Sequence, residues 1–464
     1  MQSKKRWIVI IGLLAIVNLN QVQAQKFEAV GPTYPEKQQP EEVGAVKVNF
    51  DLLPTTMSFD LPWTYCMVTE NNIKFANLAA ETYDPRDFDG TGGLASFEPG
   101  MDDEGRFVRA WIEHQSDARI VVRVRYALNN NLYDIAHPDI PSGSPYGKGD
   151  WTDEWHYIYP DGTNIRHMRI YTGLAPVSRP FGFDREPPST VHEFMESVVI
   201  GQRGHIPTDD IEIDALSLFR MFGGHSEELI EEGISATISF KPYPEDYGNF
   251  RDANIVLFNL KSEYKPFIIA MPYGVRMQPY MPEDDLPFVF QTWGSPPERG
   301  YATAFGHIIN YWHYRRTDNV LEQIYLSGMT NNPEPREELV SLAWSWITDP
   351  PLRMDGLEDE YGVYTYDPAQ KAYILPRKGR GPVRLEWMLD EPEDGPMHII
   401  NPAFILKDWD EGGVELRVDG KLIEPGKDFR IGYEETPTGH DLVLWLRMSS
   451  AEPVQFELVP VTIN

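Results

Sequence analysis

The sequence contains one cysteine and far fewer basic than acidic side chains. Cys66 has no second cysteine with which to form an intrachain disulfide, so the core must stabilise the fold. The chain has 41 lysines and arginines against 71 aspartates and glutamates, which gives a formal net charge of −30. A field of this sign repels nucleic acids and anionic membranes, so neither is an expected partner. An acidic ligand would need a local basic patch.

Short motifs for metal, phosphate or serine-hydrolase chemistry are also missing. The sequence has no HExxH, no GxSxG, no phosphate-binding glycine loop and no cysteine–histidine zinc pattern. The stretch "DFDGTGGLASFE" has the ligand spacing of a calcium loop, but Pro99 and Gly100 follow it where an exit helix should begin. We therefore expect neither a metal nor a redox cofactor.

The first 24 residues have the pattern of a secretory signal peptide. "MQSKKR" is a positive start, the 11-residue "WIVIIGLLAIV" is apolar, and "VQAQ" offers a cleavage site after Ala24. The apolar run is too short to span a bilayer, and no later segment is apolar enough to do so. We expect a periplasmic or secreted protein without membrane insertion, in which residues 25–45 form a flexible lead-in.

Alternating apolar and polar residues dominate the rest of the chain. Runs such as "ARIVVRVRYAL", "GISATISFKPY" and "NIVLFNL" predict short strands separated by turn residues. Helical periodicity is clear only in "REELVSLAWSWI". This pattern predicts a mainly β protein, with a jelly-roll-like β-sandwich catalytic domain over residues 46–350. A small immunoglobulin-like β-sandwich is expected over residues 351–464.

The stretch "WTDEWHYIYPDGTNIRHMRIY", residues 151–171, predicts a β-hairpin that turns at "YPDGT". A three-residue loop would pair Tyr159 with Thr163. Because side chains alternate along a strand, one face would then carry Glu154, His156, Asn164 and Arg166. The other face would carry Trp155, Tyr157, Tyr159, His167 and Arg169. A two-residue loop would shift the register by one and pair His156 with His167; we favour the first register.

The hairpin holds the groups that β-elimination from a uronic acid requires. The C5 proton is weakly acidic, and its removal builds an enolate-like dianion that needs a cation or strong donors at the carboxylate. Arg166 and Asn164 are the candidates for that role. His156 or Tyr157 would remove the proton, and His167 or a tyrosine would protonate the leaving oxygen. Cross-strand pairing for stability alone is the alternative, and the better explanation for any single histidine.

Further strands supply candidate substrate-binding residues. Arg123 and Arg125 lie in one row of "ARIVVRVRYAL", although ion pairing with the many acids is an alternative use. Trp312 and His313 lie in "FGHIINYWHYRR", a pattern that fits the wall of a sugar cleft or an edge strand. The remaining candidates are Trp151, at the start of the hairpin, and His192 and His205.

Four stretches, "ARIVVRVRYAL", "DEWHYIYPDGTNIRHMRIYTG", "YLSGMTNNPEP" and "LAWSWITDPP", resemble a group of secreted proteins from marine polysaccharide-degrading bacteria. Some of that group are tied to the breakdown of ulvan, and they look like polysaccharide lyases or oligosaccharide dehydratases. The resemblance implies a carbon–oxygen lyase that acts on an anionic, uronate-containing algal oligosaccharide, and it leaves lyase and dehydratase open. A glycoside hydrolase using Glu154 and Glu196 and a non-catalytic glycan-binding protein are the alternatives.

Overall fold

A computed structural model gives the structure of the protein. The residues that it describes are 28–30, 46–59, 64–83, 96–102, 104–139, 141–172, 190–222, 235–238, 253–272, 275–279, 291–294, 300–310, 314–317, 319–348, 352–355, 366–377, 379–387, 398–409, 412–437 and 439–461. The expected signal peptide and the boundary expected at residue 350 lie outside them. The fold is mainly β, as the sequence predicts, and has β-sandwich character.

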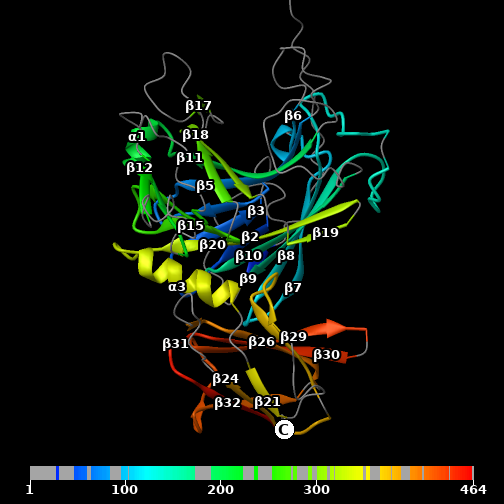
Figure 1. Cartoon of the computed structure of the whole chain (residues 1–464), viewed down its shortest axis with the longest axis vertical. Helices are drawn as coiled ribbons and strands as arrows, with labels where there is room; N and C mark the ends of the chain where they lie inside the picture. The colour runs from blue at the N-terminus through cyan, green and yellow to red at the C-terminus, as the bar shows by residue number, and fades with distance from the viewer. Residues whose placement is uncertain are drawn as a thin grey trace, which may run out of the picture.

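Two ten-stranded sheets, here called sheet A and sheet B, form the larger part of the molecule (Figure 1). Sheet A runs in the order β1 (Glu28–Val30), β2 (Val46–Asn49), β3 (Thr56–Phe59), β4 (Cys66–Val68), β5 (Lys74–Tyr83), β11 (Thr190–Ile200), β18 (Tyr301–Asn310) and β16 (Val275–Pro279), with β6 (Ser96–Phe97) on β5 and β17 (Gln291–Gly294) on β18. Sheet B runs in the order β13 (Ser235–Ile238), β12 (Ile211–Phe219), β14 (Ile255–Leu260), β15 (Lys265–Ala270), β20 (Val320–Thr330), β10 (Asn164–Tyr171), β9 (Trp151–Ile158), β8 (Ile120–Ala127) and β7 (Arg109–Gln115), with β19 (Arg315–Arg316) on β20.

The inner faces of the two sheets enclose the largest apolar core. Val122, Val124 and Met168 enter it from sheet B, and Phe75 and Met195 enter it from sheet A. Each of these alternates with a side chain on the opposite face of its strand, because successive residues of a strand point to opposite sides. The hairpin strands β9 and β10 lie in the middle of sheet B, so their inner face is sealed by sheet A.

The outer face of sheet B is divided into two parts. One part is apolar and is covered by the helix α3 (Arg336–Ile347), whose Leu339 and Trp346 pack against Ile165, Ile324 and neighbouring buried residues. Figure 1 shows α3 running along this sheet. The other part, on β7 to β10, carries aromatic and charged residues that are only partly buried. This second part is the region in which a ligand could contact the hairpin.

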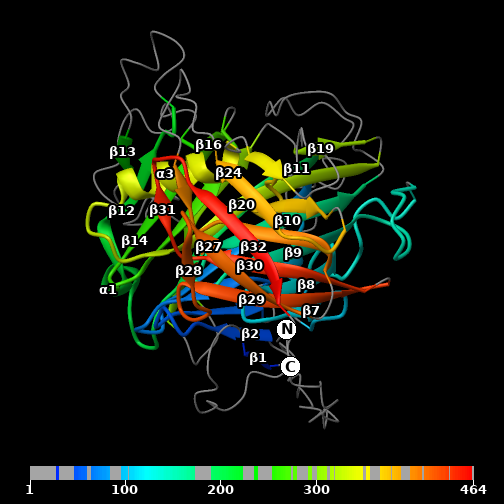
Figure 2. The ribbon, with the colours of Figure 1, turned by 90° about the horizontal axis from the view of Figure 1, so that it is seen from below.

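The C-terminal strands form a second, smaller sandwich. One five-stranded sheet runs β21 (Leu352–Asp355), β24 (Val383–Trp387), β32 (Gln455–Val461), β27 (Gly413–Val418) and β28 (Lys421–Ile423), and the other runs β22 (Tyr366–Asp367), β23 (Ala372–Pro376), β26 (Ala403–Trp409), β30 (Gly439–Leu446) and β29 (Phe429–Thr436). The strands β25 (Ile399–Ile400) and β31 (Ser449–Ser450) pair separately. The core between the two sheets includes Trp387, Phe404 and Phe456. Figure 2 views this sandwich from below, with sheet B behind it.

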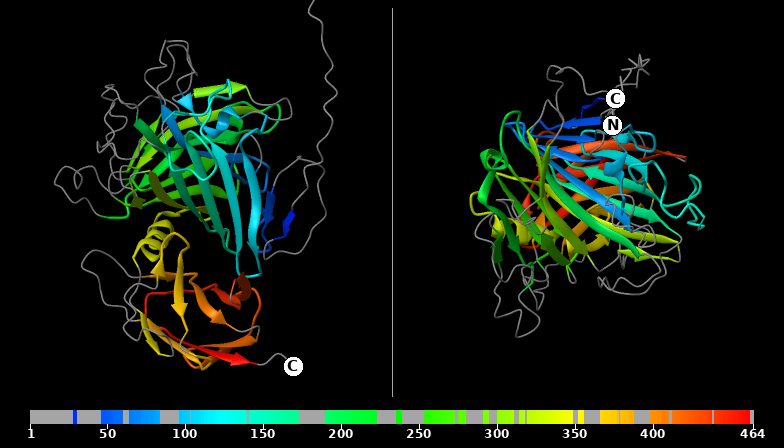
Figure 3. Two further views of the ribbon diagram at one scale, coloured as in Figure 1. Left: turned by 90° about the vertical axis from the view of Figure 1, so that its right-hand side faces the viewer. Right: turned by 90° about the horizontal axis from the view of Figure 1, so that it is seen from above.

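The smaller sandwich contacts sheet B at the turn end of the hairpin. The guanidinium of Arg119 donates to both carboxylate oxygens of Glu434, with Nε–Oε1 at 2.6 Å and Nη2–Oε2 at 2.8 Å. The Tyr159 hydroxyl donates to the carbonyl oxygen of Gln370 at 2.5 Å. The left view of Figure 3 shows strands of sheet B reaching the C-terminal sandwich. Paired and buried groups therefore hold the two parts together.

Two short helical segments complete the described elements, α1 (Pro207–Asp210) and the 3₁₀ turn η2 (Pro99–Met101). None of the helices in the described part of the chain has the length and apolar character needed to cross a bilayer.

Candidate functional site

The hairpin adopts the favoured register. His156 lies opposite Arg166 and Glu154 lies opposite Met168, and the Tyr159 N–H donates to the Thr163 carbonyl oxygen at 2.9 Å. Gly162 has φ +80°, the left-handed conformation that a three-residue loop of this kind requires. The local turn sequence thus fixes which side chains share a face, as predicted.

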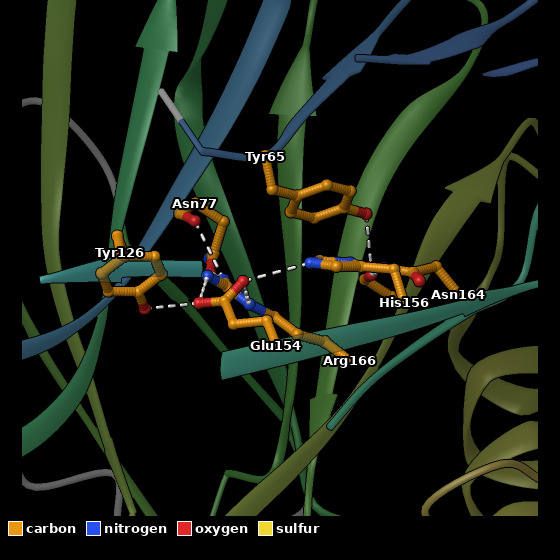
Figure 4. Close-up of polar contacts among 8 residues, drawn as sticks. Tyr65, Asn77, Tyr126, Glu154, His156, Asn164 and Arg166 are labelled. Atoms are coloured by element: carbon orange, nitrogen blue, oxygen red, sulfur yellow. Dashed lines mark hydrogen bonds and ion pairs between the residues drawn. The ribbon is translucent and has the colours of Figure 1, made fainter. Parts of the chain in front are cut away.

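The inner face of the hairpin carries a buried ion pair (Figure 4). Arg166 donates to Glu154 from Nη2 to Oε1 at 2.6 Å and from Nε to Oε2 at 3.0 Å. The Tyr126 hydroxyl donates to the same carboxylate at 2.5 Å. Arg166 Nη1 reaches across to sheet A, where it donates to the carbonyl oxygen of Asn77 at 2.9 Å and to its Oδ1 at 2.7 Å. Four of the five guanidinium N–H donors are thereby used.

His156 is held as a neutral ring in the same cluster. Its Nδ1 accepts a hydrogen bond from the Asn164 amide at 3.2 Å, so Nε2 carries the proton and donates it to Glu154 at 3.1 Å. Burial lowers the pKa of His156 and outweighs the hydrogen bond to Glu154, which raises it. Burial by itself would raise the pKa of Glu154, but the Arg166 charge and the bonds from His156 and Arg166 lower it to about 2.

This cluster has no contact with solvent. Glu154, His156 and Asn164 are 0% exposed and Arg166 is 1% exposed. The structure therefore places three of the five predicted catalytic residues, His156, Asn164 and Arg166, in the interior between the sheets. A substrate carboxylate could reach Arg166 only after the ion pair with Glu154 had broken. The expected single constellation is divided between the two faces of the hairpin.

The outer face of sheet B brings the other candidates together in two rows that cross the strands. In the first row Trp111 lies opposite Arg123, Arg123 opposite Trp155, and Trp155 opposite His167. The second row consists of Arg109, Arg125, Asp153, Arg169, Glu322 and Arg315, each opposite the next. The predicted binding residues Arg123 and Arg125 thus lie on one face with the predicted acid His167.

His167 is positioned by a carboxylate of the next strand. Its Nε2 lies 2.9 Å from Glu322 Oε2, and Arg169 Nε donates to Oε1 of the same carboxylate at 2.9 Å. Burial would raise the pKa of Glu322, but the hydrogen bonds and charges of His167 and Arg169 lower it. The His167 side chain is 11% exposed, and its Nδ1 makes no hydrogen bond to the described residues. With Nε2 directed at Glu322, Nδ1 is the ring nitrogen that remains to contact a ligand.

A tyrosine lies beside this histidine. The rings of His167 and Tyr314 meet edge to face with centroids 6.0 Å apart. Burial raises the pKa of Tyr314, and the nearby Asp367 charge raises it further, so the phenol stays protonated at neutral pH. Its hydroxyl donates to Asp367 at 3.3 Å and accepts from Arg315 at 3.2 Å. A protonated phenol next to a carboxylate-held imidazole is a suitable acid–base pair.

The remaining predicted residues lie elsewhere or outside the described residues. Tyr157 packs toward the C-terminal sandwich under the Arg119 guanidinium, 5.3 Å from its ring centroid, and burial raises its pKa. Trp151 adjoins the outer face, with its ring 5.7 Å from that of Tyr146. His205 pairs with Asp210 at 2.8 Å, near α1.

His192 lies in β11 opposite Glu81 of β5. Trp312 and His313 lie outside the described residues, as does most of the calcium-like segment. The described part of the chain holds no group of three or more potential metal ligands.

The sequence reading missed several residues of the outer face as site residues: Trp111, Tyr146, Arg169, Tyr314 and Glu322. A signal existed for Glu322, because it is the only charged residue of the strand β20 and a carboxylate inside a sheet needs a partner. Its partners on β10 are far away in the chain, so its role was not apparent without the strand order.

Comparison with known proteins adds little. No protein-family model matches the chain, and no curated protein matches it. Among solved structures, one named as a polysaccharide lyase is similar, with 7% identity and a TM-score of 0.17. The match covers 84% of this chain and 40% of that structure. At that TM-score the similarity carries no weight in the argument about function.

Proposed function

We propose that the protein is a periplasmic or secreted carbon–oxygen lyase that acts by β-elimination on uronate residues of an ulvan-type anionic oligosaccharide. The observation that supports this is the arrangement of His167, Glu322, Arg169 and Tyr314 on the partly exposed face of sheet B. That face also concentrates arginines in a chain whose net charge is −30. A substrate that carries carboxylates fits such a local basic surface.

The chemistry follows from the positions of these groups. His167 Nδ1 takes the C5 proton, and Glu322 stabilises the imidazolium that results. Arg169 lies next to Glu322 and binds the substrate carboxylate as its charge increases. The electrons of the C5–H bond form the C4=C5 double bond as the C4–O bond breaks. Tyr314 gives its proton to the departing oxygen.

The leaving group decides the name of the reaction. If the C4 oxygen belongs to the next sugar, the protein is a polysaccharide lyase. If it is the free hydroxyl of a non-reducing terminal uronate, water departs and the protein is a dehydratase. The proton transfers are the same in both reactions, and both products contain an unsaturated uronate.

The buried pair argues against a hydrolase that uses Glu154. Its carboxylate is held by Arg166, with the pKa lowered to about 2, so it cannot act as a general acid near neutral pH. Its position between the sheets also keeps it from the outer face. Non-catalytic glycan binding remains as an outcome of the test below.

The test is incubation with uronate oligosaccharides, followed by ultraviolet absorbance and mass spectrometry. Loss of one water at unchanged length indicates a dehydratase, and shorter unsaturated fragments indicate a lyase. H167Q should reduce kcat by about 100-fold or more, as expected for loss of a general base. R384Q is the control, because Arg384 is an exposed side chain of β24 in the other sandwich. Wild-type kcat in H167Q, or sugar bound with unchanged mass, contradicts the proposal.

A further inference from the structure

Arginines and aromatic rings alternate on the outer face beside the proposed catalytic groups. The Arg123 guanidinium carbon lies 4.6 Å from the Trp155 ring centroid and 5.4 Å from that of Trp111. The Arg125 guanidinium carbon lies 3.5 Å from the Tyr146 centroid and 5.2 Å from that of Trp111. We call these five residues the arginine–aromatic ladder. Four of them lie on β7 to β9, next to His167 on β10, and Tyr146 lies in the connection between β8 and β9.

One buried carboxylate orients both arginines of the ladder. Asp153 is 0% exposed and accepts from Arg123 Nη2 at 3.1 Å and from Arg125 Nε at 3.0 Å. The Tyr146 hydroxyl donates to the same carboxylate. Two guanidiniums and a phenol are therefore fixed in position before any ligand arrives, which reduces the entropy cost of binding.

Stacking leaves donors free at the edges of the ladder. A guanidinium that packs against a ring uses its faces, while its N–H groups point outward in its plane. Among the described residues, Arg125 hydrogen-bonds only through Nε, and neither of its Nη atoms has an acceptor. The side chains of Arg123 and Arg125 are 20% and 27% exposed. The indole N–H groups of Trp111 and Trp155 also have no acceptor within the described part of the chain.

The charge on this face is not balanced, although acids greatly outnumber bases in the whole chain. Arg109, Arg123, Arg125, Arg169 and Arg315 lie there with four carboxylates, those of Glu113, Asp153, Glu322 and Asp367, which leaves one positive charge in excess. Stabilisation alone explains stacked and paired arginines, but it does not require unused donors on a positive surface. Unused N–H donors and a positive surface both favour binding of an anionic sugar. Its acidic group accepts from the N–H donors, and its ring contacts the edges of the aromatic side chains.

We infer that the arginine–aromatic ladder is a second anion subsite, which binds an acidic group of the same glycan chain that lies against His167. Arg125 and Arg169 lie in one row on strands separated by β9, so they are about 10 Å apart. This distance corresponds to the length of a disaccharide. The ligand would lie across the strands and carry acidic groups on alternate sugars. The inference rests on the proposed function only in taking the ligand to be an anionic glycan.

The test compares oligosaccharides of two lengths, prepared from a sulfated glucuronate-containing algal polysaccharide. Affinity is measured by titration calorimetry for wild type, R125Q, R125K and the control R384Q. R125Q should bind the tetrasaccharide about tenfold more weakly, because it loses a hydrogen bond between charged groups. It should bind the disaccharide like wild type. R125K should be intermediate, because it keeps the charge but loses the stacked, forked donors.

The outcomes separate the subsite from the chemistry. If R125Q weakens tetrasaccharide binding while wild type leaves the sugar mass unchanged, the subsite stands and the lyase proposal fails. If wild type is active and R125Q has wild-type tetrasaccharide affinity and KM, the subsite is wrong and the lyase proposal stands. An equal loss of affinity for a carboxyl-reduced, desulfated tetrasaccharide would also overturn the inference, because no anion would then be recognised. Circular dichroism and the thermal midpoint show whether R125Q is folded.

Discussion

Removal of the Arg166 guanidinium is expected to cost about 3–5 kcal/mol of stability, the usual cost of breaking a buried ion pair from one side. In R166M the Glu154 carboxylate keeps its charge and loses two of its donors, at 2.6 and 3.0 Å. The two oxygen atoms of Asn77 on sheet A lose their partner as well. The variant should therefore weaken the contact between the sheets as well as the hairpin.

A double variant separates charge from packing. E154Q/R166M removes both charges, and the single glutamine oxygen can still accept from one of the two former donors, Tyr126 at Oε1 or His156 at Oε2. It should recover more than half of the stability lost in R166M, because no unpaired charge remains in the interior. The measurement is urea unfolding followed by tryptophan fluorescence, with E154Q alone completing the cycle. A loss below about 1 kcal/mol in R166M, or a double variant less stable than R166M, would refute this account.

The same variants decide between a structural and a catalytic Arg166. Sequence reasoning expects Arg166→Ala to abolish turnover while the fold stays intact. The buried geometry predicts the opposite result. Removal of Arg166 lowers the stability of the fold, whereas a stable E154Q/R166M protein keeps its turnover. A stable but inactive double variant would return Arg166 to the chemistry.

Two further predictions concern pH and the turn. Burial lowers the pKa of His156, so the folded state binds fewer protons than the unfolded state below the ordinary pKa of 6.5. The free energy of unfolding should therefore fall as pH drops below about 6.5, and H156Q should flatten this dependence in urea titrations at several pH values. Gly162→Ala should cost about 1–2 kcal/mol because φ is +80°, and an added Cβ would also lie too close to Leu53 Cδ1, so that side chain must move. Gly162→Asn carries the same Cβ but tolerates the conformation, so it should cost less. Equal thermal midpoints for the two variants would contradict the turn argument.

The hairpin shows which features the sequence can predict, namely its register and the face of each side chain, and which it cannot, namely the face that is buried. Pro160, Asp161 and Gly162 are adjacent in the chain, so local turn chemistry was enough to predict the register. Alternation then assigned each side chain to a face. Which face is buried depends on residues far away in sequence, namely Asn77, which meets Arg166, and Glu322, which meets His167. A charged inner face also contradicts the usual rule that polar residues point outward, and only its mutual pairing makes it stable.

The contact between Arg119 and Glu434 has a consequence for how this protein can be divided. Arg119 immediately precedes β8, the strand that carries Arg123 and Arg125, and its partner lies 315 positions later in the chain. A fragment that ended before the second sandwich would lack Glu434 and would expose Arg119 together with the apolar side chains of Ala118 and Tyr159 that pack against that sandwich. Truncation or exchange of the C-terminal sandwich therefore also alters the support of the strand that carries Arg123 and Arg125. The two parts of the chain should be engineered as one unit.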